Sequence, residues 1–401
     1  MGRKIILTAA MAVVGVAGLA GESRAQPTEC VLPANKVLIA GSTAIQPLIK
    51  AAAGPLVMAA DIDVYYANLG SCTGTVAFVK GDDLGAKSVT HFDAAGAATT
   101  CTLPAGTHAD VGVSDVFYTS CNMGALPAGF ADVQGPVQAM VFAVPHMSTQ
   151  KVLIAEEGFF TFGFMGGYMG MPIMPWSDPT KLAIRNGGSG TQQMTARAIG
   201  LPNGEAMKGT DSMNTAGVIT ALTTANASGT TAEPAIGIIG AADYDSGTNR
   251  NILTSLFFRG FKQPHAYLPD RKASSFDKGN VRDGKYAIWG PSHLIAAVGA
   301  DGKASNARVQ ALIDYISLAK PLTGANMLDI TIGAHVVPQC AMKVKRDAEI
   351  GPMSPYAPPA GTACGCYMDE KFTAGSSGCT PCTAGGAACA NGKTCSNGFC
   401  E

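Results

Sequence analysis

The feature that most constrains the fold is a short strand that leads through a glycine-rich turn into a helix. The apolar run Leu182–Ile184 predicts the strand end, and residues 192–199 predict a helix that stops at Gly200. The turn between them reads Arg185-Asn186-Gly187-Gly188-Ser189-Gly190-Thr191. Glycines allow a sharp turn, and the first amides of a helix lack partners inside it. This combination predicts a site that holds an anion, with the Arg185 guanidinium on two of its oxygens.

Alone, this turn is also typical of a solvated loop with a surface arginine, because Gly-Ser-Gly turns are common. Other turns of the same kind decide between the two interpretations. The apolar run 36–40 leads through Gly41-Ser42-Thr43 into a helix that begins at Ala44. The run 62–67 leads through Leu69-Gly70-Ser71 into a second helix. In α/β sheets, ligands bind where strands end and helices begin. We therefore expect an α/β fold whose lobes bring these turns together.

An acidic residue, Asp115, follows the apolar run 109–113 and adds a carboxylate to the expected site. Hydroxyl groups, one arginine and one carboxylate together suit a small tetrahedral oxyanion that still carries a proton. The carboxylate would accept the proton of a phosphate oxygen, whereas sulfate has no proton to offer and would be repelled. On its own, Asp115 is equally compatible with a helix cap or a surface acid.

The rest of the chain predicts further elements of the two lobes. Residues 81–108 are rich in Gly, Ala, Thr and Asp and predict an inserted hairpin or loop, held by a bridge among Cys72, Cys101 and Cys121. The run 137–144 predicts a buried strand that crosses between the lobes. Further expected elements are a buried strand at 236–240, a turn and returning strand at 280–289, and a packed helix at 307–318.

A set of short motifs follows one order between residues 36 and 340: Gly41-Ser42-Thr43-Ala44-Ile45-Gln46-Pro47-Leu48, Leu69-Gly70-Ser71, Gly112-Val113-Ser114-Asp115, Trp176-Ser177-Asp178-Pro179, Arg185 with Gly188-Ser189-Gly190-Thr191, Ile236-Gly237 and Asn280-Val281-Arg282-Asp283-Gly284-Lys285-Tyr286. With these motifs the chain resembles the periplasmic phosphate-binding proteins of ABC importers, within the type II periplasmic binding protein superfamily. The resemblance implies an α/β fold of two lobes that close on the ligand about a hinge.

The resemblance also implies how the phosphate site is divided between the lobes. In this family an acidic residue often lies near the arginine that corresponds to Arg185, whereas this chain has Gly187 there. One lobe would contribute Ser42, Thr43, Ala44, Ser71 and Asp115, and the other Arg185, Ser189, Gly190 and Thr191.

From these patterns we expect six segments along the chain. They are a signal peptide at 1–25, a first part of lobe 1 at 26–144, lobe 2 at 145–286, a returning part of lobe 1 at 287–345, a proline-rich linker at 346–363 and a cysteine-rich tail at 364–401.

The first segment has the three parts of a secretory signal peptide. Arg3 and Lys4 precede an apolar core at 5–20, and Ser23-Arg24-Ala25 offers small residues for cleavage after Ala25. A retained anchor helix is the alternative, but the core is short for one. No lipobox surrounds Cys30. We therefore expect an exported protein, either periplasmic or extracellular at the cell surface.

Twelve cysteines in an exported chain predict disulfide bonds. The sequence leaves the connectivity open, although each of the two sets is even and could close on itself. Zinc binding by the late pairs is an alternative, but the tail has no histidine and an exported protein meets an oxidising environment. The early set is Cys30, Cys72, Cys101 and Cys121, and the late set is Cys340, Cys364, Cys366, Cys379, Cys382, Cys389, Cys395 and Cys400.

Charge and motif content exclude several classes of function. The net charge of −1 provides no basic field for nucleic acid. The histidines show no metal-ligand spacing and no serine lies in a nucleophile elbow, so we expect neither catalysis nor a cofactor, with a phosphate-ester hydrolase as a minor alternative. Four methionines allow two interpretations, a site for a soft metal ion or adaptable packing between helices and loops, and we expect packing. They are Met165, Met169, Met171 and Met174.

The leading hypothesis is a monomeric solute-binding protein that captures inorganic phosphate, or a similar oxyanion, for a membrane importer. The alternative is a structural or interaction protein at the cell surface that keeps the binding fold and attaches to a partner through the cysteine-rich tail.

Overall fold

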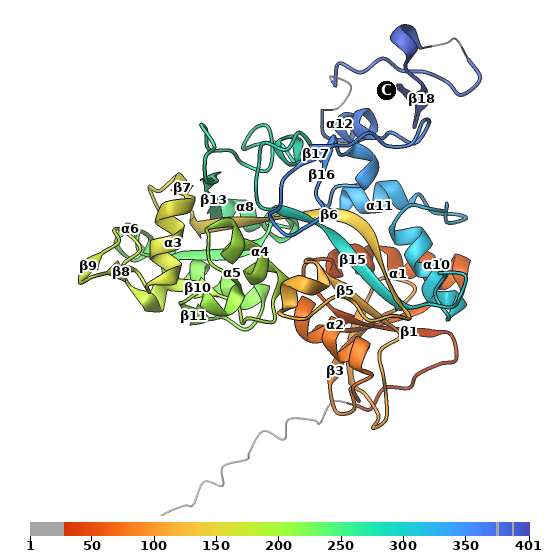
Figure 1. Cartoon of the computed structure of the whole chain (residues 1–401), viewed down its shortest axis with the longest axis horizontal. Coiled ribbons are helices and arrows are strands. Elements are labelled where there is room, and N and C mark those ends of the chain that lie inside the picture. The colour runs from red at the N-terminus through yellow and green to blue at the C-terminus, as the bar shows by residue number, and fades with distance from the viewer. Residues whose placement is uncertain (1–27, 374–376, 387–388) are drawn as a thin grey trace, which may run out of the picture.

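The computed structural model describes residues 28–373, 377–386 and 389–401. One mixed sheet of eleven strands runs through both halves of the molecule (Figure 1). Its order is β11 (Thr210–Asp211), β10 (Leu182–Ile184), β12 (Ile236–Gly240), β6 (Phe130–Pro145), β15 (Trp289–Ala297), β5 (Val111–Ser114), β1 (Lys36–Gly41), β2 (Asp63–Ala67), β3 (Ser88–Phe92) and β4 (Ala98–Thr102), with β13 (Leu253–Ser255) beside β6.

The first lobe is built on the parallel strands β2, β1 and β5. Alternate residues of β1 face opposite sides of the sheet, so Val37 packs in one hydrophobic cluster and Leu38 in another. Both faces are covered, which explains why the strand is apolar without interruption. The covering helices are α1 (Gln46–Ala60), α10 (Ala307–Ile316) and α11 (Met327–Gly333) on one face and α2 (Ser71–Lys80) on the other.

The second lobe repeats this arrangement. Strand β10 pairs in parallel with β11 and β12, and β12 pairs antiparallel with β6. The lobe also contains α3 (Ala155–Gly163), α4 (Gly190–Ala198) and α5 (Thr215–Ala225), whose apolar residues pack in the cluster around Phe142 and Ile236. The predicted α/β fold with two lobes is therefore confirmed.

Two long strands join the lobes. Strand β6 pairs with β15 over residues 130–139 and with β12 over residues 140–143, so one strand belongs to both halves. This confirms the predicted crossing strand, which begins earlier than its most apolar part. The returning segment differs from its prediction, because 280–288 contains the end of α9 (Gly279–Arg282) and a turn, and β15 begins only at Trp289.

The segment 81–108 forms the predicted hairpin, made of β3 and β4 at the edge of the sheet. Of the three cysteines predicted to form its bridge, Cys72 and Cys121 do pair, but Cys101, which lies in the hairpin, pairs with Cys30. Cys101 pairs with Cys30 because Cys30 lies beside β4. The backbone amide of Cys30 donates a hydrogen bond to the carbonyl of Thr102 in that strand.

The segment after Val344 is not the extended linker predicted from its prolines. Strand β16 (Val344–Lys345) pairs with β17 (Ser354–Pro355), and Arg346 is only 3% exposed. The Arg346 guanidinium lies 4.1 Å from the ring centre of Trp289, at the start of β15. This contact between a buried cation and an aromatic ring holds the segment on the body. The proline content of the segment does not reveal it.

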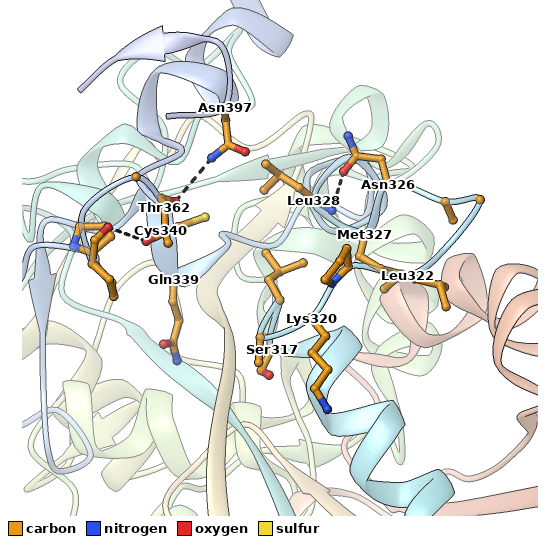
Figure 2. Close-up of a pocket in the computed structure, with 18 of the residues that line it drawn as sticks. Ser317, Lys320, Leu322, Asn326, Met327, Leu328, Gln339, Cys340, Thr362 and Asn397 are labelled. Carbon is orange, nitrogen blue, oxygen red and sulfur yellow. Dashed lines mark hydrogen bonds between the residues drawn. The ribbon is translucent and has the colours of Figure 1, made fainter. Parts of the chain in front are cut away.

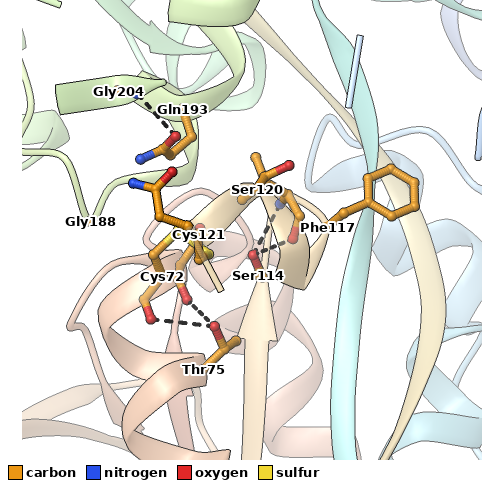
Figure 3. Close-up of a disulfide and its surroundings, with 12 residues drawn as sticks. Cys72, Thr75, Ser114, Phe117, Ser120, Cys121, Gly188, Gln193 and Gly204 are labelled. Atoms are coloured by element: carbon orange, nitrogen blue, oxygen red, sulfur yellow. Dashed lines mark hydrogen bonds between the residues drawn. A yellow bond between two sulfur atoms is a disulfide. The ribbon is translucent and has the colours of Figure 1, made fainter. Parts of the chain in front are cut away.

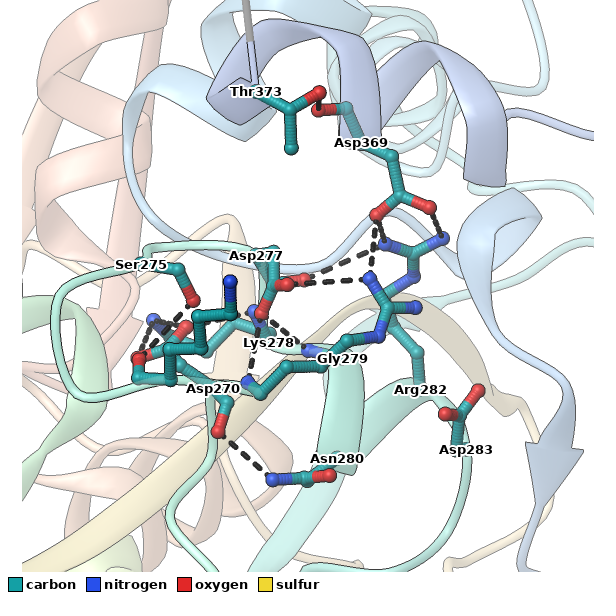
Figure 4. Close-up of polar contacts among 12 residues, drawn as sticks. Asp270, Ser275, Asp277, Lys278, Gly279, Asn280, Arg282, Asp283, Asp369 and Thr373 are labelled. Carbon is teal, nitrogen blue, oxygen red and sulfur yellow. Dashed lines mark hydrogen bonds and ion pairs between the residues drawn. The ribbon is translucent and has the colours of Figure 1, made fainter. Parts of the chain in front are cut away.

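The first part of the predicted tail also belongs to the body. Helix α12 (Gly365–Thr373) buries Met368 in the core, and the bond Cys340–Cys364 fastens its start. Figure 4 shows Asp369 of α12 against the guanidinium of Arg282, with 2.6 Å between Oδ1 and Nη1. The predicted boundary at 364 therefore does not separate an independent unit from the lobes.

The remaining tail is a small module around the hairpin of β18 (Cys395–Ser396) and β19 (Phe399–Cys400), which stands off the body in Figure 1. The late cysteines pair among themselves, as do the early ones. Since disulfide sulfur is not thiolate, the zinc alternative for the tail is wrong. The late pairs are Cys340–Cys364, Cys366–Cys379, Cys382–Cys395 and Cys389–Cys400.

Two further predictions concern the N-terminal segment and the methionines of 165–174. The predicted signal peptide, 1–25, lies outside the described residues. Packing does not explain the methionines of 165–174, because Met169 is 82% exposed on the hairpin of β8 (Gly167–Tyr168) and β9 (Met171–Pro172). Among the described residues, no helix combines the length and apolar character needed to span a bilayer.

Candidate functional site

The turn after β1 carries the first predicted site residues. Its geometry requires Gly41, because a Cβ there would lie 1.8 Å from the carbonyl oxygen of Val113 and φ is +153°. The backbone amide of Ser42 donates to the same carbonyl over 2.9 Å, which ties the turn to the end of β5. The Ser42 side chain then points at Asp115, the residue that follows β5.

Asp115 is the centre of the first lobe's contribution and is 2% exposed. Its Oδ1 accepts hydrogen bonds from Ser42 Oγ and, over 3.0 Å, from Gln138 Nε2. Its Oδ2 accepts one from Ser71 Oγ over 3.1 Å. Burial raises the pKa of Asp115 above its ordinary value, and the hydrogen bonds from the two serines and the charge of Arg185 oppose this rise.

Arg185 follows β10 and is the cation of the second lobe. Its Nη1 donates to Thr215 Oγ1 over 3.1 Å and to Thr43 Oγ1 of the first lobe over 3.4 Å. Its Nε donates to the Met213 carbonyl over 3.4 Å. Hydroxyl and carbonyl groups therefore orient this guanidinium.

The start of α4 faces Asp115 at Gly190. A Cβ on Gly190 would lie 2.3 Å from Ser71 Oγ and 2.9 Å from Asp115 Oδ2, so only glycine allows this approach. Ser189 caps the helix, because its Oγ accepts from the amide of Gln192 over 3.4 Å. Thr191 is buried in the same turn of the helix.

A disulfide lies directly beside this junction (Figure 3). Cys72 follows Ser71 at the start of α2, and Cys121 ends the short helix η1 (Tyr118–Cys121) that comes after Asp115. The bond therefore fixes the two polypeptide segments that carry the serine and the carboxylate. The amide of Cys72 also donates to the Gly188 carbonyl of the second lobe over 2.9 Å.

The structure thus brings the predicted residues to one junction between the lobes, which we call the interlobe site. Within the first turn, the Ala44 amide donates to Ser42 Oγ over 3.0 Å. The interlobe site comprises Ser42, Thr43, Ala44, Ser71, Asp115, Arg185, Ser189, Gly190 and Thr191.

Sequence reasoning missed two side chains of this region. Gln138, which donates to Asp115, is a polar residue inside the apolar run of β6, and that interruption was its signal. Asp243 lies in the first turn of α7 (Ala241–Asp245), the helix that directly follows β12. Burial raises the pKa of Asp243 to about 7, against the opposing charge of Arg185.

A cavity of about 770 Å³ lies elsewhere, between the loop after α10 and the chain that leads to the tail (Figure 2). None of the interlobe residues lines it. Lys320 is the one charged residue among its described lining, which also includes Gln339, Asn326 and Asn397. It does not offer the set of donors that surrounds Asp115.

No protein-family model and no curated protein sequence matches this chain. Among solved structures it is similar to one from Clostridium perfringens, described as a phosphate ABC transporter substrate-binding protein with bound phosphate. The TM-score is 0.50 and the identity 14%, over 76% of this chain and 99% of that chain. An ABC-type phosphate transport receptor from Vibrio cholerae gives a TM-score of 0.46 at 11% identity, over 76% and 99%.

A third similar structure is a DING protein, with a TM-score of 0.44 and 17% identity over 75% of this chain and 90% of that chain. The similarity to the Clostridium perfringens protein extends over nearly all of that chain, and it concerns the fold alone. The described chain therefore has the two-lobed α/β fold of a phosphate-binding protein, with an added C-terminal disulfide-rich tail.

Proposed function

We propose that this protein binds inorganic phosphate at the interlobe site. The observation that carries the proposal is the position of Asp115, which accepts hydrogen bonds from Ser42 and Ser71 and faces the second lobe at Gly190. Arg185 supplies positive charge from the opposite lobe, and its charge acts on Asp115. An oxyanion between the lobes would meet a fixed cation, hydroxyl donors and one carboxylate.

The remaining acceptor capacity of Asp115 supports a protonated ligand. A carboxylate has about four acceptor positions, and Ser42, Gln138 and Ser71 occupy three of them. The free position belongs to Oδ2, the oxygen nearest to Gly190. A phosphate P–OH group can donate to it. Sulfate has no proton at neutral pH, so its oxygens would face a buried carboxylate without a hydrogen bond between them.

The wider role in this proposal is that of an exported, monomeric solute-binding protein without catalytic activity or cofactor. It would deliver phosphate to a membrane importer. The double connection through β6 and β15 supports such a role, because strands shared by two lobes allow them to rotate about a hinge.

Calorimetric titration with phosphate and with sulfate tests the binding proposal. We expect one site per chain, heat with phosphate and no comparable heat with sulfate. The titrations use the full chain in the same buffer and at the same pH. Absence of binding with phosphate, or equal affinity for the two anions, would refute the proposal.

A second candidate function, attachment at the cell surface, rests on the module at 377–401. It stands off the lobes in Figure 1, and disulfides hold its short hairpin. A chain shortened after residue 376, with Cys366→Ser to avoid a free thiol, would test this role while leaving α12 in place. If the module is an attachment site, the shortened chain leaves the cell-surface fraction; unchanged fractionation contradicts the idea.

A further inference from the structure

Asp243 is a second carboxyl group close to the interlobe site. It follows Gly240, the last residue of β12, and a Cβ on Gly240 would lie 2.8 Å from Asp243 Oδ2 and 3.6 Å from the side chain of Ala44. The carboxyl therefore comes from the second lobe and lies beside the first turn of the first lobe. Its charge acts on Arg185, and the charges of Arg185 and Asp115 act on it.

One oxygen of this carboxyl has no protein partner. Oδ2 of Asp243 is inaccessible and accepts no hydrogen bond from the described residues. A buried carboxylate oxygen without a donor costs free energy. A proton on the carboxyl, or a donor carried by a ligand, removes that cost.

Once an oxyanion is bound, the charges around Asp243 favour the protonated form of its carboxyl over the ionised form. Arg185, at the end of β10, is the cation that faces it, and Asp115, after β5, is the other acid. Asp211, in β11, also acts on Arg185. A bound phosphate would add at least one negative charge where Arg185 already faces several acids. Like charges at short range raise the cost of keeping a carboxylate ionised.

We infer that Asp243 takes up a proton when the oxyanion binds, so that its carboxyl does not repel the anion that Asp115 and Arg185 hold. This inference rests on the proposed phosphate function and adds a proton uptake by the protein to it. The ligand class is a tetrahedral oxyanion that carries protons at neutral pH, such as dihydrogen phosphate or dihydrogen arsenate. Asp115 accepts one ligand proton, and the protonated Asp243 carries no charge that would repel the anion.

The pH at which this uptake is visible follows from the unliganded protein. Burial raises the pKa of Asp243 to about 7, and a bound anion raises it further. At pH 6 the carboxyl already carries its proton before binding, so binding adds little. At pH 8 the free protein is mostly ionised at this position, so binding must add about one proton.

The test is calorimetric titration of the full chain with phosphate, in pairs of buffers that differ in ionisation enthalpy. The buffer dependence of the heat counts the protons taken up. Because phosphate itself titrates in this range, the readout is the difference between the natural protein and Asp243→Asn. At pH 8 we expect the variant to take up about one proton fewer per phosphate, and at pH 6 the difference should vanish. Above pH 7 the natural protein should lose affinity about tenfold more per pH unit than the variant.

Asp211→Asn is the matched control, because its carboxylate also acts on Arg185 but is exposed on β11. It should take up the same number of protons as the natural protein. If Asp243→Asn does not fold, Asp243→Ala removes the same proton without leaving a buried amide. Equal proton uptake by the natural protein and the Asp243 variant would overturn the inference while leaving phosphate binding intact. If the natural protein does not bind phosphate at all, the proposed function and this inference both fail.

Discussion

The guanidinium of Arg185 lies 3.4 Å from the hydroxyl of Thr43, measured from Nη1 to Oγ1. This contact joins the second lobe to the first turn of the first lobe. The amide of Cys72 and the carbonyl of Gly188 make another such contact nearby. The lobes are therefore closed on each other in this structure.

Replacing Arg185 should remove most of the phosphate affinity. Arg185 is buried and would make charge-assisted hydrogen bonds to the anion. Arg185→Ala should therefore weaken the free energy of phosphate binding by on the order of 3 kcal/mol, or about a hundredfold in Kd. Arg259→Ala is the control, because that arginine pairs with Glu156 on the surface of the second lobe. Calorimetry with phosphate measures both variants. An affinity that stays unchanged in Arg185→Ala would show that the anion binds elsewhere.

A methyl group at Gly190 should prevent the lobes from closing fully. The added Cβ would lie 2.3 Å from Ser71 Oγ, closer than any two such atoms can approach. We expect Gly190→Ala to weaken phosphate binding at least tenfold, while the thermal stability of the unliganded protein changes little. Gly229→Ala is the control, since a Cβ there meets nothing within 4 Å. Normal phosphate affinity in Gly190→Ala would mean that the observed closure is not the binding conformation.

The sequence predicted the parts of the site that have a local signature. Ser42, Ser71 and Arg185 each occupy a turn between a strand and a helix, and such turns are recognisable because glycine and hydroxyl residues follow an apolar run. Asp243 was missed, because it does not follow β12 directly: Ala241 and Ala242, which carry no polar group, lie between it and Gly240, the last residue of the strand.

Other features depend on contacts that no local pattern contains. Cys30 and Cys101 are 71 residues apart and pair only because β4 lies beside the N-terminal residues. The segment after Val344 has the prolines of a linker, yet the stacking of Arg346 on Trp289 holds it on the body. Both contacts form through tertiary packing, so neither the partner of Cys101 nor the structure after Val344 could be predicted from composition.

The buried acid Glu349 should make the protein more stable at acidic pH. Burial raises the pKa of Glu349 from 4.5 to about 7, with the charges of His293 and Arg346 opposing the rise. The folded protein therefore binds one proton more than the unfolded chain between these two values. Stability from this group is highest at the acidic end of that window and falls as the pH rises to about 7.

Glu349→Gln isolates this effect from that of other acids. An amide oxygen can still accept the hydrogen bond from the Phe117 amide, which is 3.3 Å from Glu349 Oε2. We expect the variant to raise the Tm at pH 8 and to leave it nearly unchanged at pH 5. Asp347→Asn, at an exposed position two residues earlier, should have no such pH-dependent effect. Equal shifts at both pH values would contradict the assigned cause.

The ion pair between Asp369 and Arg282 should hold α12 on the body. The Arg282 side chain is 1% exposed, and its Nη1 lies 2.6 Å from Asp369 Oδ1. Removing the carboxylate leaves a buried cation with carbonyl partners, those of Asp277, Ala341 and Gly365. Breaking a buried pair in this way costs about 3–5 kcal/mol. Asp369→Ala should therefore lower the Tm clearly, as differential scanning calorimetry would measure.

The neighbouring Glu370→Ala is the control for this helix, because the substitution removes an acid that is not a partner of Arg282. This substitution should lower the free energy of unfolding by about 1 kcal/mol or less. Since Asp369 pairs with Arg271 and Arg282, which lie outside the interlobe site, we also expect Asp369→Ala to keep its phosphate affinity at temperatures where it is folded. A loss of affinity without a loss of stability would mean that α12 acts on the interlobe site, and not only on the packing of the tail.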